Sequence, residues 1–191
     1  MKNSLKYALR ILLVVFFLGL SFYFLIYSSP NVLVGFIGTD NAYLLMFILA
    51  FFGGLTTFSG IPYHIILITL ALGGLNLFLL GFSAAMGVMV GDSTSYFVGY
   101  QGSAILPESV KKILQPIRSF AKNYPKTLPV IFFSYGALIP FSNDFIVISM
   151  GLSKYPFWKV MLPLGVGTIF FNVMLAFLAK YAYGFLQIIF F

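Results

Sequence analysis

Long apolar runs, separated by short polar or glycine- and proline-rich breaks, make up most of the chain. Three of these runs cover residues 11–27, 77–100 and 160–183. Each approaches the roughly 20 residues that a helix needs to cross a bilayer. None shows the alternation of apolar and polar residues that marks a transmembrane barrel strand. The pattern predicts an all-α integral membrane protein, with residues 1–191 forming a single membrane domain.

Two further apolar stretches, 43–73 and 128–153, are interrupted near their middles by residues that break helices. A proline in a helix interior removes a backbone hydrogen bond and clashes with the preceding turn. Each arm of about a dozen residues is about 18 Å long, short of the roughly 30 Å hydrocarbon core. We therefore expect two re-entrant helical hairpins, although charge alone leaves full spans open. The expected tip residues are Ser59, Gly60, Pro62, Gly136 and Pro140.

The two hairpins resemble each other, and each is followed by a spanning helix that carries glycine. The matching positions are Pro62 and Pro140, Gly73 and Gly151, Gly87 and Gly167, and Asp92 and Asn172. The number of membrane crossings that precede each unit predicts that the two units insert in opposite orientations. The sequence thus predicts an inverted repeat of re-entrant hairpin plus transmembrane helix, preceded by one transmembrane helix. Such repeats with broken helices are typical of alternating-access transporters.

Composition and charge agree with a membrane location. The chain is 61% hydrophobic and 8% charged, whereas soluble domains have about 25% charged residues. Its net charge of +7 comes from bases beside apolar segments, which indicates topology and anionic lipid headgroups rather than nucleic acid. We expect a multi-pass protein of the plasma membrane with a cytoplasmic N-terminus. A cleaved signal sequence is the alternative interpretation of 11–27, but no convincing small-residue cleavage site follows it.

Segment 104–126 combines apolar residues at helical spacing with several bases. It is interpreted as a cytoplasmic amphipathic segment, broken or kinked at Pro116, that lies at the lipid interface. A solvated positive-inside loop explains the same pattern. The bases expected to contact lipid headgroups are Lys111, Lys112, Arg118, Lys122 and Lys126.

Two acids, Asp92 and Asp144, lie within apolar segments. An ionisable residue at membrane depth is costly and usually faces a cavity or a partner. We therefore expect a polar path for substrate or ions between the hairpins. Its candidate residues are Asp92, Asp144, Asn143, Ser142, His64, Tyr96 and Asn172.

Each of these residues also has a purely structural interpretation. Asp92 can bond neighbouring hydroxyls or cap a local turn, and Asp144 can be a charge that suits the helix dipole. His64 can be a packing histidine, and Asn143 and Asn172 can join helices by hydrogen bonds. Ser142 or Asn143 is expected to N-cap the second arm of its hairpin.

Enzymatic chemistry has little support in the sequence. The chain has no cysteine, one histidine and four acids, which leaves no thiol nucleophile and no clustered metal ligands. A serine triad built on Ser59 or Ser142 with His64 would require a geometry that the sequence does not show. We expect no catalysis, no metal and no cofactor.

The segment 91–102, GDSTSYFVGYQG, resembles the G-D-x-x-x-Y-x-x-G-x-x-G signature of the DedA / VTT-domain (SNARE-associated) membrane family. Residues 133–155 resemble its second conserved segment by spacing. The resemblance implies movement of lipids between leaflets, by scrambling or by flipping lipid phosphates such as polyprenyl phosphate. The family's two arginines fall here on Ala137 and Asn143, and its glutamate falls on His64.

The expected function is a lipid scramblase or flippase-type transporter that moves phospholipid or polyprenyl phosphate through a polar site between the hairpins. An ion- or proton-coupled small-solute exporter or channel that uses the same site is the alternative. A structural or assembly role is the third class. The expected partners are membrane lipids with anionic headgroups; a homo-oligomer is compatible with the sequence, and nucleic acid is not expected.

Overall fold

A computed structural model of the chain describes residues 30–55, 63–105, 107–139 and 142–190. These residues form helices and their connections with no strand among them, which confirms the prediction of an all-α chain. Several predicted features lie outside the described residues, namely the span 11–27 and the tip residues Ser59, Gly60, Pro62 and Pro140.

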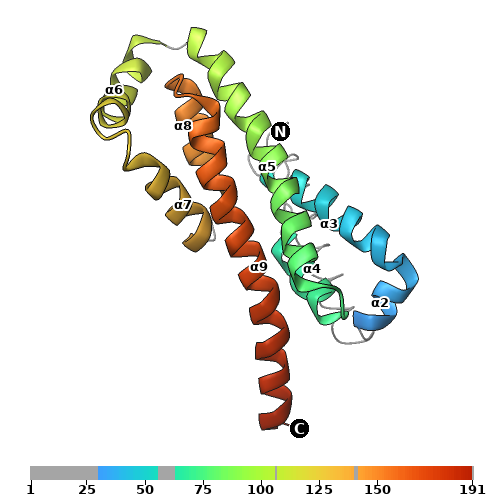
Figure 1. The fold of residues 1–191 in the computed structure, drawn as a ribbon. Helices are drawn as coiled ribbons and strands as arrows, with labels where there is room; N and C mark the ends of the chain where they lie inside the picture. The colour runs from blue at the N-terminus through green and yellow to red at the C-terminus, as the bar shows by residue number, and fades with distance from the viewer. Residues whose placement is uncertain (1–29, 56–62, 106, 140–141, 191) are drawn as a thin grey trace, which may run out of the picture.

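Two long helices, α5 (Leu77–Gly102) and α9 (Phe157–Phe190), run antiparallel and pack against each other (Figure 1). Within the described residues, these are the helices long and apolar enough to cross a membrane, which indicates membrane association. The predicted span 160–183 lies within α9, and the helix itself continues through Gly184 to Phe190. A single glycine costs a helix only about 1 kcal/mol, so apolar neighbours can sustain it.

Short helices form two pairs beside the long ones. The first pair is α3 (Thr39–Gly54) and α4 (Tyr63–Leu72), and the second is α7 (Leu128–Leu138) and α8 (Asp144–Leu152). Figure 1 shows α4 joining α5 at its lower end and α8 joining α9 at the opposite, upper end. Helix α3 packs along α5 and α4 against α9, whereas α7 packs along α9 and α8 against α5. Each pair therefore contacts both long helices.

The α3–α5 contact depends on glycine. A Cβ added to Gly87 would collide with the carbonyl oxygen of Phe47 and lie 2.9 Å from the backbone nitrogen of Phe51. A Cβ added to Gly91 would lie 2.6 Å from the carbonyl oxygen of Phe51. Small residues permit this close approach of helix backbones, which is a common basis of helix packing in membranes.

The α7–α9 contact is built in the same way. A Cβ added to Gly167 would collide with the carbonyl oxygen of Phe133 and lie 2.9 Å from the nitrogen of Ala137. On the facing helix, a Cβ added to Gly136 would lie 2.6 Å from the carbonyl oxygen of Leu164. The second contact thus repeats the first with equivalent atoms on a different pair of helices.

The chain before α3 is largely helical. Residues Pro30–Ile37 form helix α2. Proline suits a helix start because its φ is already helical and the N–H it lacks would have no intrahelical partner there. Gly38, with φ of 84°, then turns the chain into α3.

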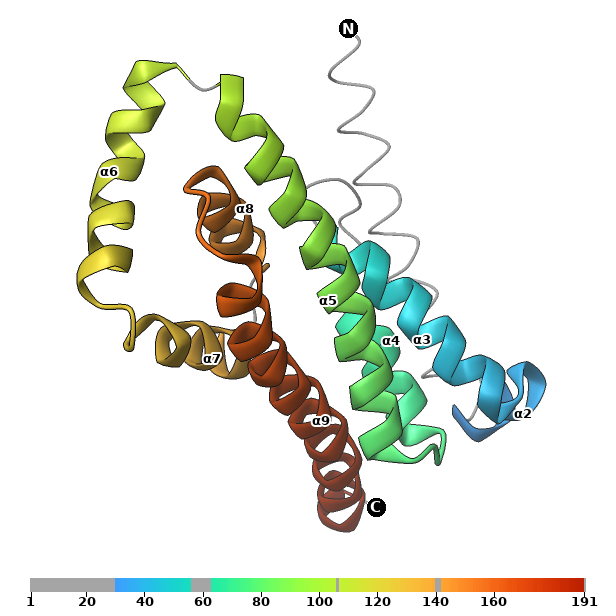
Figure 2. The same cartoon turned by 45° about the horizontal axis from the view of Figure 1, so that its top comes forward.

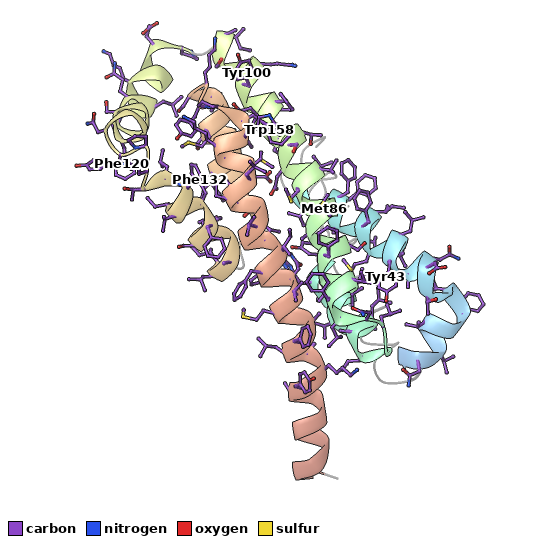
Figure 3. The ribbon with its side chains drawn as sticks, in the orientation of Figure 1. Tyr43, Met86, Tyr100, Phe120, Phe132 and Trp158 are labelled. Atoms are coloured by element: carbon purple, nitrogen blue, oxygen red, sulfur yellow. The ribbon has the colours of Figure 1, made fainter. Side chains whose placement is uncertain are left out.

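Tyr43 connects α3 to the start of α5 (Figure 3). Its hydroxyl accepts a hydrogen bond from the backbone nitrogen of Asn76 at 2.9 Å. Its carbonyl oxygen accepts another from the hydroxyl of Ser83 at 2.6 Å. The first turns of α5 are therefore held against α3.

Between α5 and α7 lie the short helix η1 (Ser103–Ile105) and α6 (Glu108–Asn123). Figure 2 shows α6 on the other side of α5 and α9 from α2 and α3. Helix α6 continues through Pro116. Lys112 and Lys126 are exposed, whereas the side chains of Lys111, Arg118 and Lys122 lie outside the described part of the structure.

The interior has two apolar cores. One surrounds Leu67, Leu70 and Leu80; the other contains Val147 of α8 and Phe132 of α7, which Figure 3 labels. The outer surface of α9 is also apolar, and its exposed large side chains are Trp158, Leu162, Val166, Phe170, Phe177, Leu178 and Tyr181. Water-soluble monomers rarely expose such a continuous apolar surface, so it favours contact with lipid.

We expect Gly87→Ala and Gly167→Ala each to destabilise the protein by about 1–3 kcal/mol, because the new methyl group meets backbone that has little room to move. The measurement is the apparent Tm of the detergent-purified protein. Gly35→Ala is the matched control, since a Cβ at Gly35 has no neighbour within 4 Å. Alanine there should be neutral or stabilising by up to about 1 kcal/mol. Equal Tm changes in all variants would contradict the glycine packing described.

Candidate polar site between the helix pairs

Asp92 lies midway along α5 and is only 1% exposed. Its Oδ2 accepts a hydrogen bond from Nδ2 of Asn143 at 2.7 Å. Asn143 precedes α8, so this bond joins the start of the second helix of one pair to the centre of a long helix. Burying a carboxylate is expensive without such a donor. The bond thus explains part of how Asp92 is tolerated inside.

Asn143 is free to reach Asp92 because Ser142 performs the local capping. Asn143 occupies the N-cap position of α8, but its side chain makes no capping hydrogen bond. Instead, the hydroxyl oxygen of Ser142 accepts from the backbone nitrogen of Asp144 at 3.2 Å, and that hydroxyl donates to Oδ2 of Asp144 at 2.9 Å. Of the two residues expected to cap this helix, Ser142 contacts its first turn and Asn143 contacts another helix.

Helix α9 contributes Thr168 and Asn172, one turn apart. Nδ2 of Asn143 lies 3.4 Å from Oγ1 of Thr168, so the same amide that donates to Asp92 also approaches α9. Thr168 donates back to the carbonyl oxygen of Leu164 at 3.0 Å. Asn172 donates to the carbonyl oxygen of Thr168 at 2.9 Å. Asn143 therefore connects the two long helices.

Two tyrosines extend this polar cluster. The hydroxyl of Tyr135 on α7 donates to the carbonyl oxygen of Ser142 at 3.0 Å and lies within electrostatic range of both Asp92 and Asp144. The buried Tyr63 of α4 approaches Asn172 and lies within electrostatic range of Asp92. Side chains from α4, α5, α7, α8 and α9 thus converge on one buried region, which we call the polar cluster.

Three oxygens in the polar cluster or next to it on α5 have no hydrogen-bond partner among the described residues. They are Oδ1 of Asp92, Oγ of Ser95 and Oδ1 of Asn172. The three residues are at most 1% exposed. A buried polar atom without a hydrogen bond destabilises the fold by about 1–3 kcal/mol. These oxygens are therefore candidate binding atoms for a ligand or a proton.

Two of the candidate residues, His64 and Tyr96, make their described contacts outside the hydrogen-bond network of the polar cluster. His64 packs between aromatic rings, with centroids 3.9 Å from Tyr63 and 5.6 Å from Phe171, so its described contacts fit the packing interpretation. Tyr96 donates its hydroxyl hydrogen to the carbonyl oxygen of Tyr155 and holds the α8–α9 connection against α5. The exposed Lys112 and Lys126 lie on or beside α6, outside the cluster.

The cluster includes residues that the sequence interpretation did not single out, namely Thr168, Tyr135 and Tyr63, and Ser95 lies one turn from Asp92 on α5. Thr168 had a usable signal, since it lies four residues before Asn172 and therefore on the same helix face. Ser95 lies three residues after Asp92 and shares its face in the same way. Tyr135 and Tyr63 had no such signal, because tyrosines are frequent in this chain.

Comparison with known proteins matched no family model, no curated protein and no solved structure. The resemblance to the DedA / VTT-domain family therefore stays a prediction.

A double-mutant cycle tests the contact between Asp92 and Asn143. Asn143→Leu should cost about 1–3 kcal/mol, because it leaves a buried carboxylate without its donor. Adding Asp92→Leu removes the group that needed the donor, so the double variant should cost less than the sum of the single variants by about 1 kcal/mol or more. Apparent Tm in detergent provides the measurement. Ser93→Ala serves as a control on the same helix, and strictly additive effects of the pair would refute the coupling.

Proposed function

We propose that the chain is a multi-pass membrane transporter built as an inverted repeat. Three observations support this proposal. The helices α3, α4, α7 and α8 have 16, 10, 11 and 9 residues, fewer than the roughly 20 needed to span a bilayer. The pairs join the long helices at opposite ends. Finally, equivalent glycine contacts recur at Gly87 and Gly167, as expected of two related units.

In this proposal each short pair is a re-entrant hairpin, and both hairpins reach the polar cluster from opposite membrane faces. Non-helical backbone at membrane depth is tolerated only where protein or a polar cavity surrounds it. The connection before α8 satisfies that requirement, because Ser142 and Asn143 bond to Asp144, Asp92 and Tyr135. A polar site shared by two opposed hairpins is the usual arrangement in inverted-repeat transporters.

The cargo that we propose is a membrane lipid, phospholipid or polyprenyl phosphate, moved between the leaflets. The observation that carries this choice is the junction of a polar interior with an apolar exterior. The cluster offers hydroxyl and amide groups inside, while α9 presents large apolar side chains outside. A headgroup can cross beside polar groups while its tails remain in hydrocarbon. The basic helix α6 would hold anionic headgroups near the entrance.

An ion- or proton-coupled exporter or channel is the second candidate, and the acidity of the cluster favours it. Asp92 and Asp144 are both buried and lie within electrostatic range of each other. Two carboxylates disfavour a phosphate and favour a cation. The two acids therefore support a transported or coupling cation, whereas the apolar exterior supports a lipid cargo.

Vesicles that contain the purified chain test lipid movement. We expect the protein to accelerate the exchange of fluorescent phospholipid or polyprenyl phosphate between leaflets, and Asp92→Asn to reduce that rate about tenfold or more, as for a loss of about 1.4 kcal/mol of barrier stabilisation. Asp40→Asn is the matched control, because Asp40 is an exposed acid in the first turn of α3. Rates equal to those of protein-free vesicles would refute lipid transport, and a flux assay with small solutes then tests the second candidate.

Cysteine labelling tests the re-entrant insertion, and the absence of native cysteine makes it specific. Asn76 and Thr127, exposed at the two hairpin mouths, should label from opposite membrane faces when changed to cysteine. Phe58→Cys and Phe141→Cys, near the expected tips, should resist a membrane-impermeant reagent from the face opposite their mouths, since a re-entrant tip does not reach it. Full labelling there would mean that the arms span the membrane.

A further inference from the structure

The charge of Asp92 has no counter-ion in the described structure. Among the described residues, the amide of Asn143 is the one donor to its Oδ2, and its Oδ1 has no partner. The lysine side chains that the structure describes are all exposed: Lys112, Lys126, Lys154, Lys159 and Lys180. The partly buried His64 packs on the rings of Tyr63 and Phe171. An ionised carboxylate in such a place requires a positive charge nearby.

Ser95 shares a helix face with Asp92, and its hydroxyl oxygen also has no partner in the part of the chain that the structure describes. The other serine and threonine hydroxyls of α5 are bonded: Ser83 to the carbonyl oxygen of Tyr43, Ser93 to that of Met89 and Thr94 to that of Gly91. Helical serines commonly satisfy themselves by bonding back to the preceding turn. Ser95 does not, although it is 1% exposed. Its hydroxyl is therefore available to a ligand beside Asp92.

Asp144 adds a second acidic group to the same region. It is 5% exposed and directly follows Asn143, whose amide donates to Asp92 at 2.7 Å. Carboxylate and hydroxyl oxygens are the ligands that hard cations prefer. Two neighbouring carboxylates away from water also attract a single positive charge.

We propose that Asp92 and Ser95, on the face of α5 next to the start of α8, bind one small monovalent cation, either Na+ or a proton, and that Asp144 contributes its charge. The cation neutralises Asp92 and binds the oxygens of Asp92 and Ser95 that have no partner among the described residues. If the proposed transport function holds, this cation is its coupling ion; the binding itself does not depend on that function.

The groups that face Asp92 from neighbouring elements limit the interpretation of pH effects. Asp144 belongs to α8, Tyr135 to α7 and Tyr63 to α4. Helix α9 presents Thr168 and Asn172, which do not titrate. The titratable residues of α3, Asp40 and Tyr43, lie in its first turns, where Tyr43 contacts the start of α5. Among the described residues, the carboxyl groups near the cluster are therefore those of Asp92 and Asp144.

Apparent Tm, followed by the fluorescence of the single tryptophan, tests the proposal on the detergent-purified full chain. The protein is compared in sodium, potassium and choline chloride at equal ionic strength. If the cation is Na+, sodium should raise Tm by about 2–4 °C. Asp92→Asn and Ser95→Ala should abolish the rise, whereas Ser93→Ala and Asp40→Asn should retain it.

If the cation is a proton, Tm should not differ among the three salts. The folded chain then binds one more proton than the unfolded chain, so stability falls as pH rises. Over about pH 5 to 8, a range that begins just above the ordinary carboxyl values, this fall should be steeper in the wild type than in Asp92→Asn. A Tm insensitive to salt, with equal pH slopes in both proteins, would overturn the cation site.

The vesicle assay separates this site from the transport proposal. A sodium or proton effect without lipid movement keeps the cation site and removes the lipid cargo. Lipid movement without either effect keeps the cargo and removes the cation site.

Discussion

The close approach of helix backbones at glycine is the constraint on which the rest of the fold depends. At Gly87 and Gly167 a short helix lies so close to a long one that a side chain would meet backbone atoms. Because the short helices lie that close, their ends reach the centre of the molecule, where Asn143 meets Asp92 and Thr168. Without a hydrophobic drive between helices in lipid, such packing carries much of their association.

The polar cluster is costly, and the fold offsets that cost only in part. The side-chain amide of Asn143 donates to Asp92 and makes no bond to the start of α8. The hydroxyl oxygen of Ser142 accepts from the backbone nitrogen of Asp144 instead. Yet oxygens of Asp92, Ser95 and Asn172 remain without described partners. Buried polar atoms in purely structural networks usually have hydrogen-bond partners. The oxygens without partners, where both helix pairs meet, therefore favour a binding site over a purely structural network.

The chemistry of this site bears on the choice of cargo. The positions where the resembling family has arginines are Ala137 and Asn143 here, and neither supplies the charged fork that grips phosphate. The cluster is acidic and fits a cation better than an anion. If the proposed transport function holds, a lipid headgroup would pass beside neutral amides and hydroxyls, and the proposed cation at Asp92 would set the charge of the path. Both proposals concern the same helix junction.

The sequence by itself determined the all-α fold, the two long apolar helices and the short arms around proline, because helix period and proline chemistry act over a few residues. It also marked Asp92, Asn143 and Asp144, since buried polarity stands out in an apolar run. Only the tertiary structure decided which of them touch: Asn143, the donor to Asp92, lies 51 positions further along the chain, and no local pattern encodes that pairing. The same holds for His64, whose neighbour Phe171 lies far along the chain and places it among aromatic rings.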